Sequence, residues 1–325
     1  MAKLNLVEAI NLALAEEMGR DERIIVLGED VGRLGGVFRV TDGLQSQFGV
    51  NRVIDTPLAE AGIVGTALGL ALGGLKPVVE IQFMGFLPPA LDQIICHISR
   101  YRNRTRGRHT VPLVVRMPYG AGIHAPEHHS ESIESILAHI PGIKVVIPSN
   151  PYDAKGLLIS ALRDPDPVMF LEPKRIYRAI RQEVPEGEYT VPLGTANIIR
   201  SGKSVTAVAW GAMVREVMRA AELVEPEGIA VEVIDLRSIS PLDDDTIVQS
   251  IKKTGCGVIV HEACRTCGMA AEIIARINEK AFLSLAAPLE RVTGFDTIPP
   301  LLKLEEHFLP DVFRISRAIR KIAQF

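Results

Sequence analysis

Glu60 opens a predicted helix over residues 60–72 whose other side chains are small or apolar. A carboxylate in the first turn of a helix has an ordinary structural role, because it interacts favourably with the helix N-terminus. In an apolar crevice, however, desolvation would raise the pKa of Glu60 and make it a usable proton donor or acceptor near neutral pH. The residue pattern alone leaves both roles open.

A second candidate site is the polar loop at residues 120–131, called the histidine loop below, which follows a predicted buried strand. The loop contains His124, His128 and His129. Loops at the ends of strands in open α/β sheets commonly handle ligands. Pro126 opposes the helical spacing that a metal-binding histidine pair would need, so a general acid or a donor to an anionic substrate is the preferred hypothesis. A polar loop without chemistry is the alternative.

Glycines recur every four residues along and just past the same predicted helix, at Gly65, Gly69 and Gly73. This spacing places them on one helical face, where another backbone can approach closely. Each interior glycine costs about 1 kcal/mol of helix stability relative to alanine. The stripe therefore predicts a tight helix contact, and we expect it between subunits.

Two motifs that resemble nucleotide sites fail on inspection. The sequence GKS at 202–204 lacks the earlier glycine of a phosphate-binding loop, because Asn197 stands in its place. The sequence GAGIHA at 120–125 fits a dinucleotide fingerprint, but Pro126 interrupts the helix that should follow. A nicotinamide-dependent oxidoreductase is therefore only a distant alternative.

Neither the cysteines nor the arginines predict a further site. Cys264 and Cys267 lie near His261 but have no second pair to complete a zinc site. Arginine occupies every second position of one segment, and Tyr101 is the only aromatic residue between these arginines. This pattern favours a solvated helix end over a nucleic-acid patch: Arg100, Arg102, Arg104, Arg106 and Arg108.

The composition sets the class of protein. The 325 residues are 47% hydrophobic and carry a net charge of −3, which predicts two folded domains and gives no reason to expect nucleic acid. Four cysteines in so long a chain indicate a reducing compartment. The first residues lack the apolar core of a signal peptide, and the most apolar stretch, 61–75, is too short and glycine-rich for a membrane span. We expect a cytoplasmic protein that does not contact membranes.

Short apolar runs alternate with helical patterns, which predicts a parallel α/β fold in two domains. The acidic, proline-interrupted segment 183–192 is the best linker, so we place the domains at 1–188 and 189–325. The predicted strands are 24–27, 78–83, 113–117, 144–147, 168–171, 205–209, 230–234 and 257–260. The predicted helices are 6–18, 60–72, 89–102, 152–163, 214–223, 244–252 and 269–282.

Six stretches of the sequence are together highly specific: VLGEDV at 26–31, GGVF at 35–38, DTPLAE at 55–60, EIQF at 80–83, PSNPYDAKGLL at 148–158 and FLEP at 170–173. On these stretches the sequence resembles, nearly end to end, the β subunit of the thiamine-diphosphate-dependent 2-oxo acid dehydrogenases. These proteins combine an N-terminal parallel-sheet domain that binds the cofactor's pyrimidine with a C-terminal transketolase-type α/β domain.

The resemblance implies roles for four residues. Glu60 would bond the aminopyrimidine ring of thiamine diphosphate and promote the tautomer that deprotonates the thiazolium carbon. Phe86 would pack on that ring, with Gln82 nearby. His129 matches the family histidine that assists transfer of the acyl group to lipoate, although the adjacent His128 leaves open which side chain faces the site.

The resemblance also implies metals and partners. Thiamine-diphosphate enzymes hold magnesium and the diphosphate through a Gly-Asp-Gly motif followed by Asn-Asn, and neither part is present. An α subunit should therefore supply that half in an α2β2 heterotetramer. The C-terminal end, at 322–325, would help to dock the dihydrolipoyl acyltransferase. A potassium ion would be held by five backbone carbonyls, those of Leu113, Ala161, Leu162, Asp164 and Asp166.

The substrate is less well determined by the sequence. IHAPEHH at 123–129 resembles the pyruvate version of the family, whereas FLEPKR at 170–175 resembles the branched-chain version. We predict oxidative decarboxylation of pyruvate, with branched-chain 2-oxo acids or acetoin as alternatives. A scaffold subunit without catalytic residues is the remaining alternative.

Overall fold

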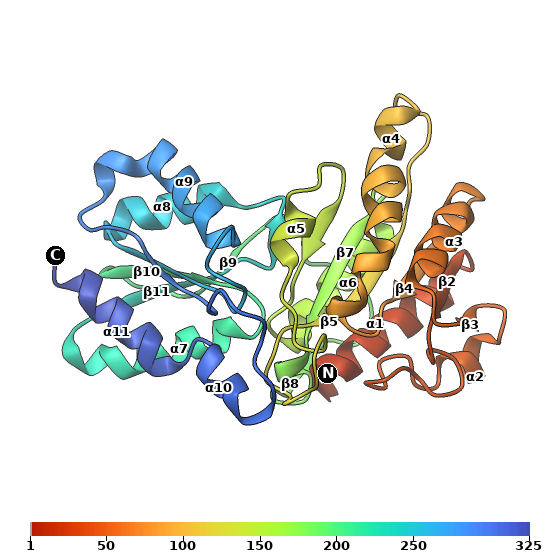
Figure 1. Cartoon of the computed structure of the whole chain (residues 1–325), viewed down its shortest axis with the longest axis horizontal. Helices are drawn as coiled ribbons and strands as arrows, with labels where there is room; N and C mark the ends of the chain where they lie inside the picture. The colour runs from red at the N-terminus through yellow and green to blue at the C-terminus, as the bar shows by residue number, and fades with distance from the viewer. Residues whose placement is uncertain (1) are drawn as a thin grey trace.

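The computed structural model describes residues 2–325, which form two large β-sheets lying side by side with helices on both faces (Figure 1) and one small two-stranded sheet. The first sheet has seven strands: β2 (Ile24–Gly28), β3 (Val53–Asp55), β4 (Lys76–Glu80), β5 (Val114–Tyr119), β6 (Lys144–Val146), β7 (Val168–Pro173) and β12 (Ser238–Ser240). Their order is β12-β6-β7-β5-β4-β2-β3, and all neighbouring pairs are parallel except β12 with β6.

The second sheet contains five strands in the order β14-β13-β10-β11-β9, parallel except at β9. These strands are β9 (Asn197–Arg200), β10 (Val205–Ala209), β11 (Val231–Asp235), β13 (Gly257–Val260) and β14 (Glu290–Val292). A separate antiparallel pair joins β1 (Ala2–Leu4) to β8 (Gln182–Val184). The predicted parallel α/β architecture is confirmed for both halves of the chain.

Helices connect the strands, and α1, α6, α8 and α11 begin at polar side-chain caps. Asn5 caps α1 (Leu6–Arg20) by accepting a hydrogen bond from the Glu8 N–H at 3.0 Å, and the Glu8 carboxylate accepts one from the Asn5 N–H. Asn150 caps α6 in a similar way, with Pro151 in the first turn. The helices are α1, α2 (Leu44–Phe48), α3 (Glu60–Leu72), α4 (Tyr101–Arg104), α5 (Glu134–Ala138), α6 (Pro151–Arg163), α7 (Met213–Val224), α8 (Asp244–Thr254), α9 (Met269–Ala281), α10 (Glu305–Phe308) and α11 (Val312–Ala323). None of the helices within residues 2–325 is long and apolar enough to cross a membrane.

The continuous helix predicted over residues 89–102 is wrong in detail. The segment is helical, but its hydrogen bonding changes from a 3-10 turn to a π-turn at Gln93–His97, then to a second 3-10 turn and finally to α4. The apolar spacing is satisfied, since Ile94 and Ile98 are buried. The spacing of apolar residues in the sequence indicates which face of a helix is buried, but it does not indicate such shifts in hydrogen-bond register.

Successive side chains of the central strands point to opposite faces of the sheet and contribute to two continuous hydrophobic cores. In β2 and β4, Val26 and Val78 belong to the core formed with α1, α6, α7 and α11, whereas Leu27 and Val79 belong to the core formed with α3, α8 and α9. Both faces of each sheet are therefore covered, which explains why these strands are continuously apolar. The same two cores extend across both sheets and join the halves of the chain.

The C-terminal half also contributes directly to the first sheet. After β11 the chain leaves the second sheet, and the next strand, β12, pairs antiparallel with β6 of the first sheet. Beside this junction, the Ser149 hydroxyl donates to the Asp235 carboxylate and Arg237 forms an ion pair with Asp153 at 2.7 Å. The predicted linker is itself anchored, because the buried Lys155 ammonium donates to the carbonyls of Pro185 and Gly187. The division at residue 188 stays a prediction.

Asp235 at this junction predicts a dependence of stability on pH. Burial raises the pKa of Asp235 from its ordinary 3.8 to about 7. The folded state therefore holds a proton that the unfolded state has released, so stability falls as pH rises toward 7 and levels off above it. Each unit of pKa difference corresponds to about 1.4 kcal/mol. We expect the variant Asp235→Asn to flatten the decline in urea-unfolding free energy between pH 5 and pH 8; an unchanged slope would assign that decline to other groups.

Candidate functional site

The residues predicted to do chemistry converge at one edge of the first sheet. Strands β3, β2 and β4 end in register, with Gly28 paired to Asp55 on one side and to Glu80 on the other. Because parallel strands point the same way, the segments that follow them emerge together at the carboxyl edge. These segments carry Glu60, Gln82 and, after β5, the histidine loop.

Glu60 lies at the start of α3 and is only 9% exposed. Within the described residues, its carboxylate accepts no hydrogen bond, although a buried carboxylate normally has a partner. Burial, and then the nearby charge of Glu60, raise the pKa of Glu29, which places these two carboxyl groups close together. Glu60 is therefore available to a hydrogen-bonding group from outside this chain.

Aromatic rings form the other side of this edge. Phe86 is half-buried, and its ring contacts Phe83 edge to face with 5.6 Å between centroids. The His129 ring lies 4.4 Å from Phe83 and 5.1 Å from Phe86, so His129 points inward. His128 is exposed and has a φ of +66°. Gln82 is half-buried and reaches toward Asp30 at 3.4 Å.

The turn that carries Phe86 and the histidine loop approach each other backbone to backbone. A Cβ atom at Gly85 would lie 1.9 Å from the His128 carbonyl oxygen. Since such a separation is impossible, only glycine fits at this position. The close approach sets the inward position of the neighbouring His129 ring against the aromatic rings.

A buried ionic network supports the same edge from below. Arg116, in the centre of the sheet, donates to Glu172 at 2.7 Å and to Glu80 at 2.9 Å. The Tyr177 hydroxyl donates to Glu172 at 2.6 Å. Burial raises the pKa of Glu80, and the charge of Arg116 opposes that rise. A buried, hydrogen-bonded network of this kind fixes the strand ends from which the Gln82 segment leaves.

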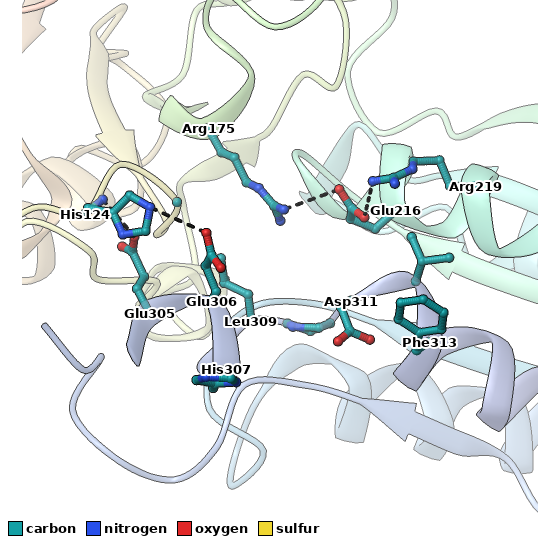
Figure 2. Close-up of a pocket in the computed structure, with 13 residues that line it drawn as sticks. His124, Arg175, Glu216, Arg219, Glu305, Glu306, His307, Leu309, Asp311 and Phe313 are labelled. Carbon is teal, nitrogen blue, oxygen red and sulfur yellow. Dashed lines mark hydrogen bonds and ion pairs between the residues drawn. The ribbon is translucent and has the colours of Figure 1, made fainter. Parts of the chain in front are cut away.

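Sequence reasoning missed three charged residues that hold the histidine loop. Glu262 and Glu305 come from the C-terminal half, and Lys174 follows β7. Figure 2 shows the neighbouring cavity, of about 410 Å³, with Glu305 and Glu306 pointing toward His124 and with Arg175 and Glu216 across from them. No local sequence signal could have found these contacts, because Glu262, Glu305 and Lys174 bond residues 141, 181 and 54 positions away.

Of the other predicted features, Cys264 comes close to this edge, because it lines a cavity with Ser130 and Glu131 of the histidine loop. Cys264 and Cys267 are free thiols, and no group of three or more metal-ligating residues is found within residues 2–325. Gly69 on α3 and Gly73 just after it are exposed in the single chain, whereas Gly65 is half-buried beside Gln93. The five residues of the predicted potassium site surround the ends of β5, α6 and β7: Leu113, Ala161, Leu162, Asp164 and Asp166. That site stays a prediction.

Comparisons with known proteins bear on this arrangement. Residues 2–180 match the family model "Transketolase, pyrimidine binding domain", and residues 194–315 match "Transketolase, C-terminal domain". The chain resembles the split gene transketolase, inactive beta4 tetramer, with a TM-score of 0.81 over 99% of both chains at 23% identity, which supports the fold.

Three full-length relatives carry the same name. The pyruvate dehydrogenase E1 component subunit beta of Acholeplasma laidlawii is 55% identical over 324 residues, covering 100% of this chain and 99% of the relative. The proteins of the same name from Bacillus subtilis (strain 168) and Staphylococcus aureus (strain Mu50 / ATCC 700699) are 51% and 50% identical over 325 residues, covering 100% of each chain. With its two transketolase-type domains, the chain therefore belongs to the family of pyruvate dehydrogenase E1 β subunits.

Proposed function

We propose that this chain acts in the oxidative decarboxylation of pyruvate and in transfer of the acyl group to the lipoyl group of a dihydrolipoyl acyltransferase. The observation that carries the proposal is the nearly buried Glu60 carboxylate, which has no hydrogen-bond partner in the described chain. Its position at the sheet edge shared with Phe86 and His129 supports the same conclusion. The names of the full-length relatives support pyruvate as the substrate.

The residues present fit the ring end of thiamine diphosphate. An unpartnered, nearly buried carboxylate suits a heterocyclic nitrogen or amino group, and the half-buried Phe86 offers an aromatic surface. When bound, the cofactor supplies the electron sink that decarboxylation requires. Glu60 would hold and exchange a proton with the pyrimidine, Gln82 would lie nearby, and His129 would act at the acyl-transfer end.

An α subunit completes the site in this proposal, and it holds magnesium and the diphosphate. The exposed Gly69 and Gly73 of the stripe support a packing surface for a subunit of the α2β2 assembly. We further propose potassium binding by the carbonyls named above, docking of the acyltransferase on the C-terminal domain, and a cytoplasmic location.

The stripe gives a prediction about assembly. A Cβ atom at Gly69 would meet nothing within 4 Å in the single chain, so Gly69→Glu should leave the fold intact. A glutamate would still prevent close approach of another backbone, so we expect loss of the complex with the α subunit by size-exclusion chromatography and light scattering. Gly19→Glu in α1 is the matched control, because its Cβ also meets open space. Normal assembly of the Gly69 variant would show that the stripe is not an interface.

The substrate is tested by dye reduction in the complex of this chain with its natural α subunit. Pyruvate, branched-chain 2-oxo acids and acetoin are compared with and without thiamine diphosphate and magnesium. We expect cofactor-dependent turnover with pyruvate preferred. A preference for another acid would correct the substrate alone. Absence of turnover, combined with tight NAD binding by the single chain, would support the nicotinamide alternative.

A further inference from the structure

The histidine loop needs outside contacts to keep its shape. It connects β5 to α5 without regular secondary structure, and its base is closed by one backbone hydrogen bond from the Gly120 N–H to the Glu131 carbonyl at 2.9 Å. Within it, His124 and His128 have φ values of +54° and +66°, which side chains other than glycine rarely adopt. Such conformations persist only where the surroundings enforce them.

Two buried carboxylates of the C-terminal half supply these contacts. Glu262 accepts a hydrogen bond from the Ala121 N–H at 2.9 Å. Glu305 uses both of its oxygens, accepting from the His124 N–H at 2.8 Å and from the Ser130 hydroxyl at 2.9 Å. The two carboxylates are 3% and 1% exposed. Glu305 therefore bridges the two ends of the segment that contains His129.

Lys174 balances the charge of this cluster. Its ammonium donates to the Gly120 carbonyl, and burial lowers the pKa of Lys174 to about 8 against the opposing attraction of Glu262 and Glu305. Buried charges are tolerated only when they are paired and hydrogen-bonded, and removing one member of such a set is strongly destabilising. The cluster of Glu262, Glu305 and Lys174 therefore holds the loop in one conformation and joins it to the C-terminal half.

We propose that Glu305 is a positioning residue for His129. By fixing positions 124 and 130, its carboxylate holds the intervening turn so that the His129 ring stays against Phe83 and Phe86. The C-terminal domain thereby shapes the acyl-transfer end of the site, although its side chains need not touch substrate. This inference rests on the proposed function for its catalytic consequence, but its structural part is independent of activity.

The chain offers a matched control in the next residue. The Glu306 carboxylate lies 3.7 Å from Nε2 of the His124 ring, but Glu306 is 78% exposed. Water therefore screens the electrostatic interaction between the two side chains. Figure 2 shows both glutamates facing His124 from α10. Glu305→Gln is the conservative variant, because its amide can accept from the His124 N–H while donating to the Ser130 hydroxyl oxygen.

The test measures amide hydrogen exchange in the histidine loop and acylation of a lipoyl domain by the complex with the α subunit. We expect Glu305→Ala to speed exchange across 121–131 and to slow acylation by about tenfold to 100-fold. Glu305→Gln should recover most of the rate, and Glu306→Ala should change neither quantity. In a His129→Ala background, Glu305→Ala should cause no further loss of acylation. If Glu305→Ala folds poorly, Ser130→Ala is measured in its place. This variant removes only one of the contacts of Glu305, so it should speed exchange and slow acylation to a smaller extent.

Two results would overturn the proposal. The first is unchanged exchange in the loop of the Glu305→Ala or Ser130→Ala variant. The second is a further loss of acylation when Glu305→Ala is added to His129→Ala. A wild-type complex without acylation would instead refute the proposed function, and the exchange measurement would still decide whether Glu305 holds the loop.

Discussion

Replacing Glu60 by glutamine should lower kcat for pyruvate decarboxylation by about 10²–10⁴-fold, the usual contribution of a positioned proton donor or acceptor. Glutamine keeps the size of the side chain and the start of α3 but cannot exchange a proton. In the single chain Glu60 is nearly buried and makes no hydrogen bond within the described residues, so little structural stability is expected to depend on it. The measurement is steady-state dye reduction by the complex with the α subunit.

A control separates the structural role of Glu60, as a first-turn carboxylate, from its proposed catalytic role. A helix-end charge contributes about 0.3–1 kcal/mol to stability, so Glu60→Gln should shift the unfolding free energy by no more than that. Asp245→Asn removes a first-turn charge from α8, where the side chain is 94% exposed, and should leave kcat unchanged. If Glu60→Gln retained full turnover, the scaffold alternative would replace the catalytic assignment.

Replacing His129 by alanine should slow acylation of the lipoyl group by about 10²–10⁴-fold and should slow dye reduction much less. The difference arises because dye reduction does not require transfer of the acyl group to lipoate. The inward position of His129, 4.4 Å from Phe83, makes it the histidine of the adjacent pair that can face bound reactants. Both rates are measured on the same preparation.

His128→Asn is the matched control for this experiment. Asparagine tolerates the positive φ of His128 better than most residues, and the side chain is exposed. We expect this variant to acylate lipoate at close to the wild-type rate. Equal losses from the two substitutions, or equal effects of His129→Ala on both reactions, would contradict the assignment of His129 to acyl transfer.

Much of the fold could be predicted because its main signal is local. Strands buried on both faces read as continuous apolar runs, and β2, β7 and β10 follow the predicted ranges closely. Strand β12 could not be predicted as part of the first sheet, since its pairing with β6 joins residues more than 90 positions apart. The linker was also more firmly held than its composition indicated, because Lys155 bonds its carbonyls from α6.

The candidate site divides in the same way. Glu60, Gln82 and Phe86 are predicted from local sequence and family resemblance, and the sheet brings their segments to one edge. The sequence left the choice between His128 and His129 open, since backbone conformation decides it. Glu305 was missed because its partners, His124 and Ser130, lie 181 and 175 positions away. Contacts that depend on the packing of two domains have no local pattern.

The central claim is that this chain holds half of a thiamine-dependent site that another subunit completes. Release of labelled CO2 from pyruvate labelled at its carboxyl carbon, measured in a single turnover, tests it most directly. The account predicts release only when this chain, the α subunit, thiamine diphosphate and magnesium are all present. Release by either subunit alone, or none from a verified complex with bound cofactor, would contradict it.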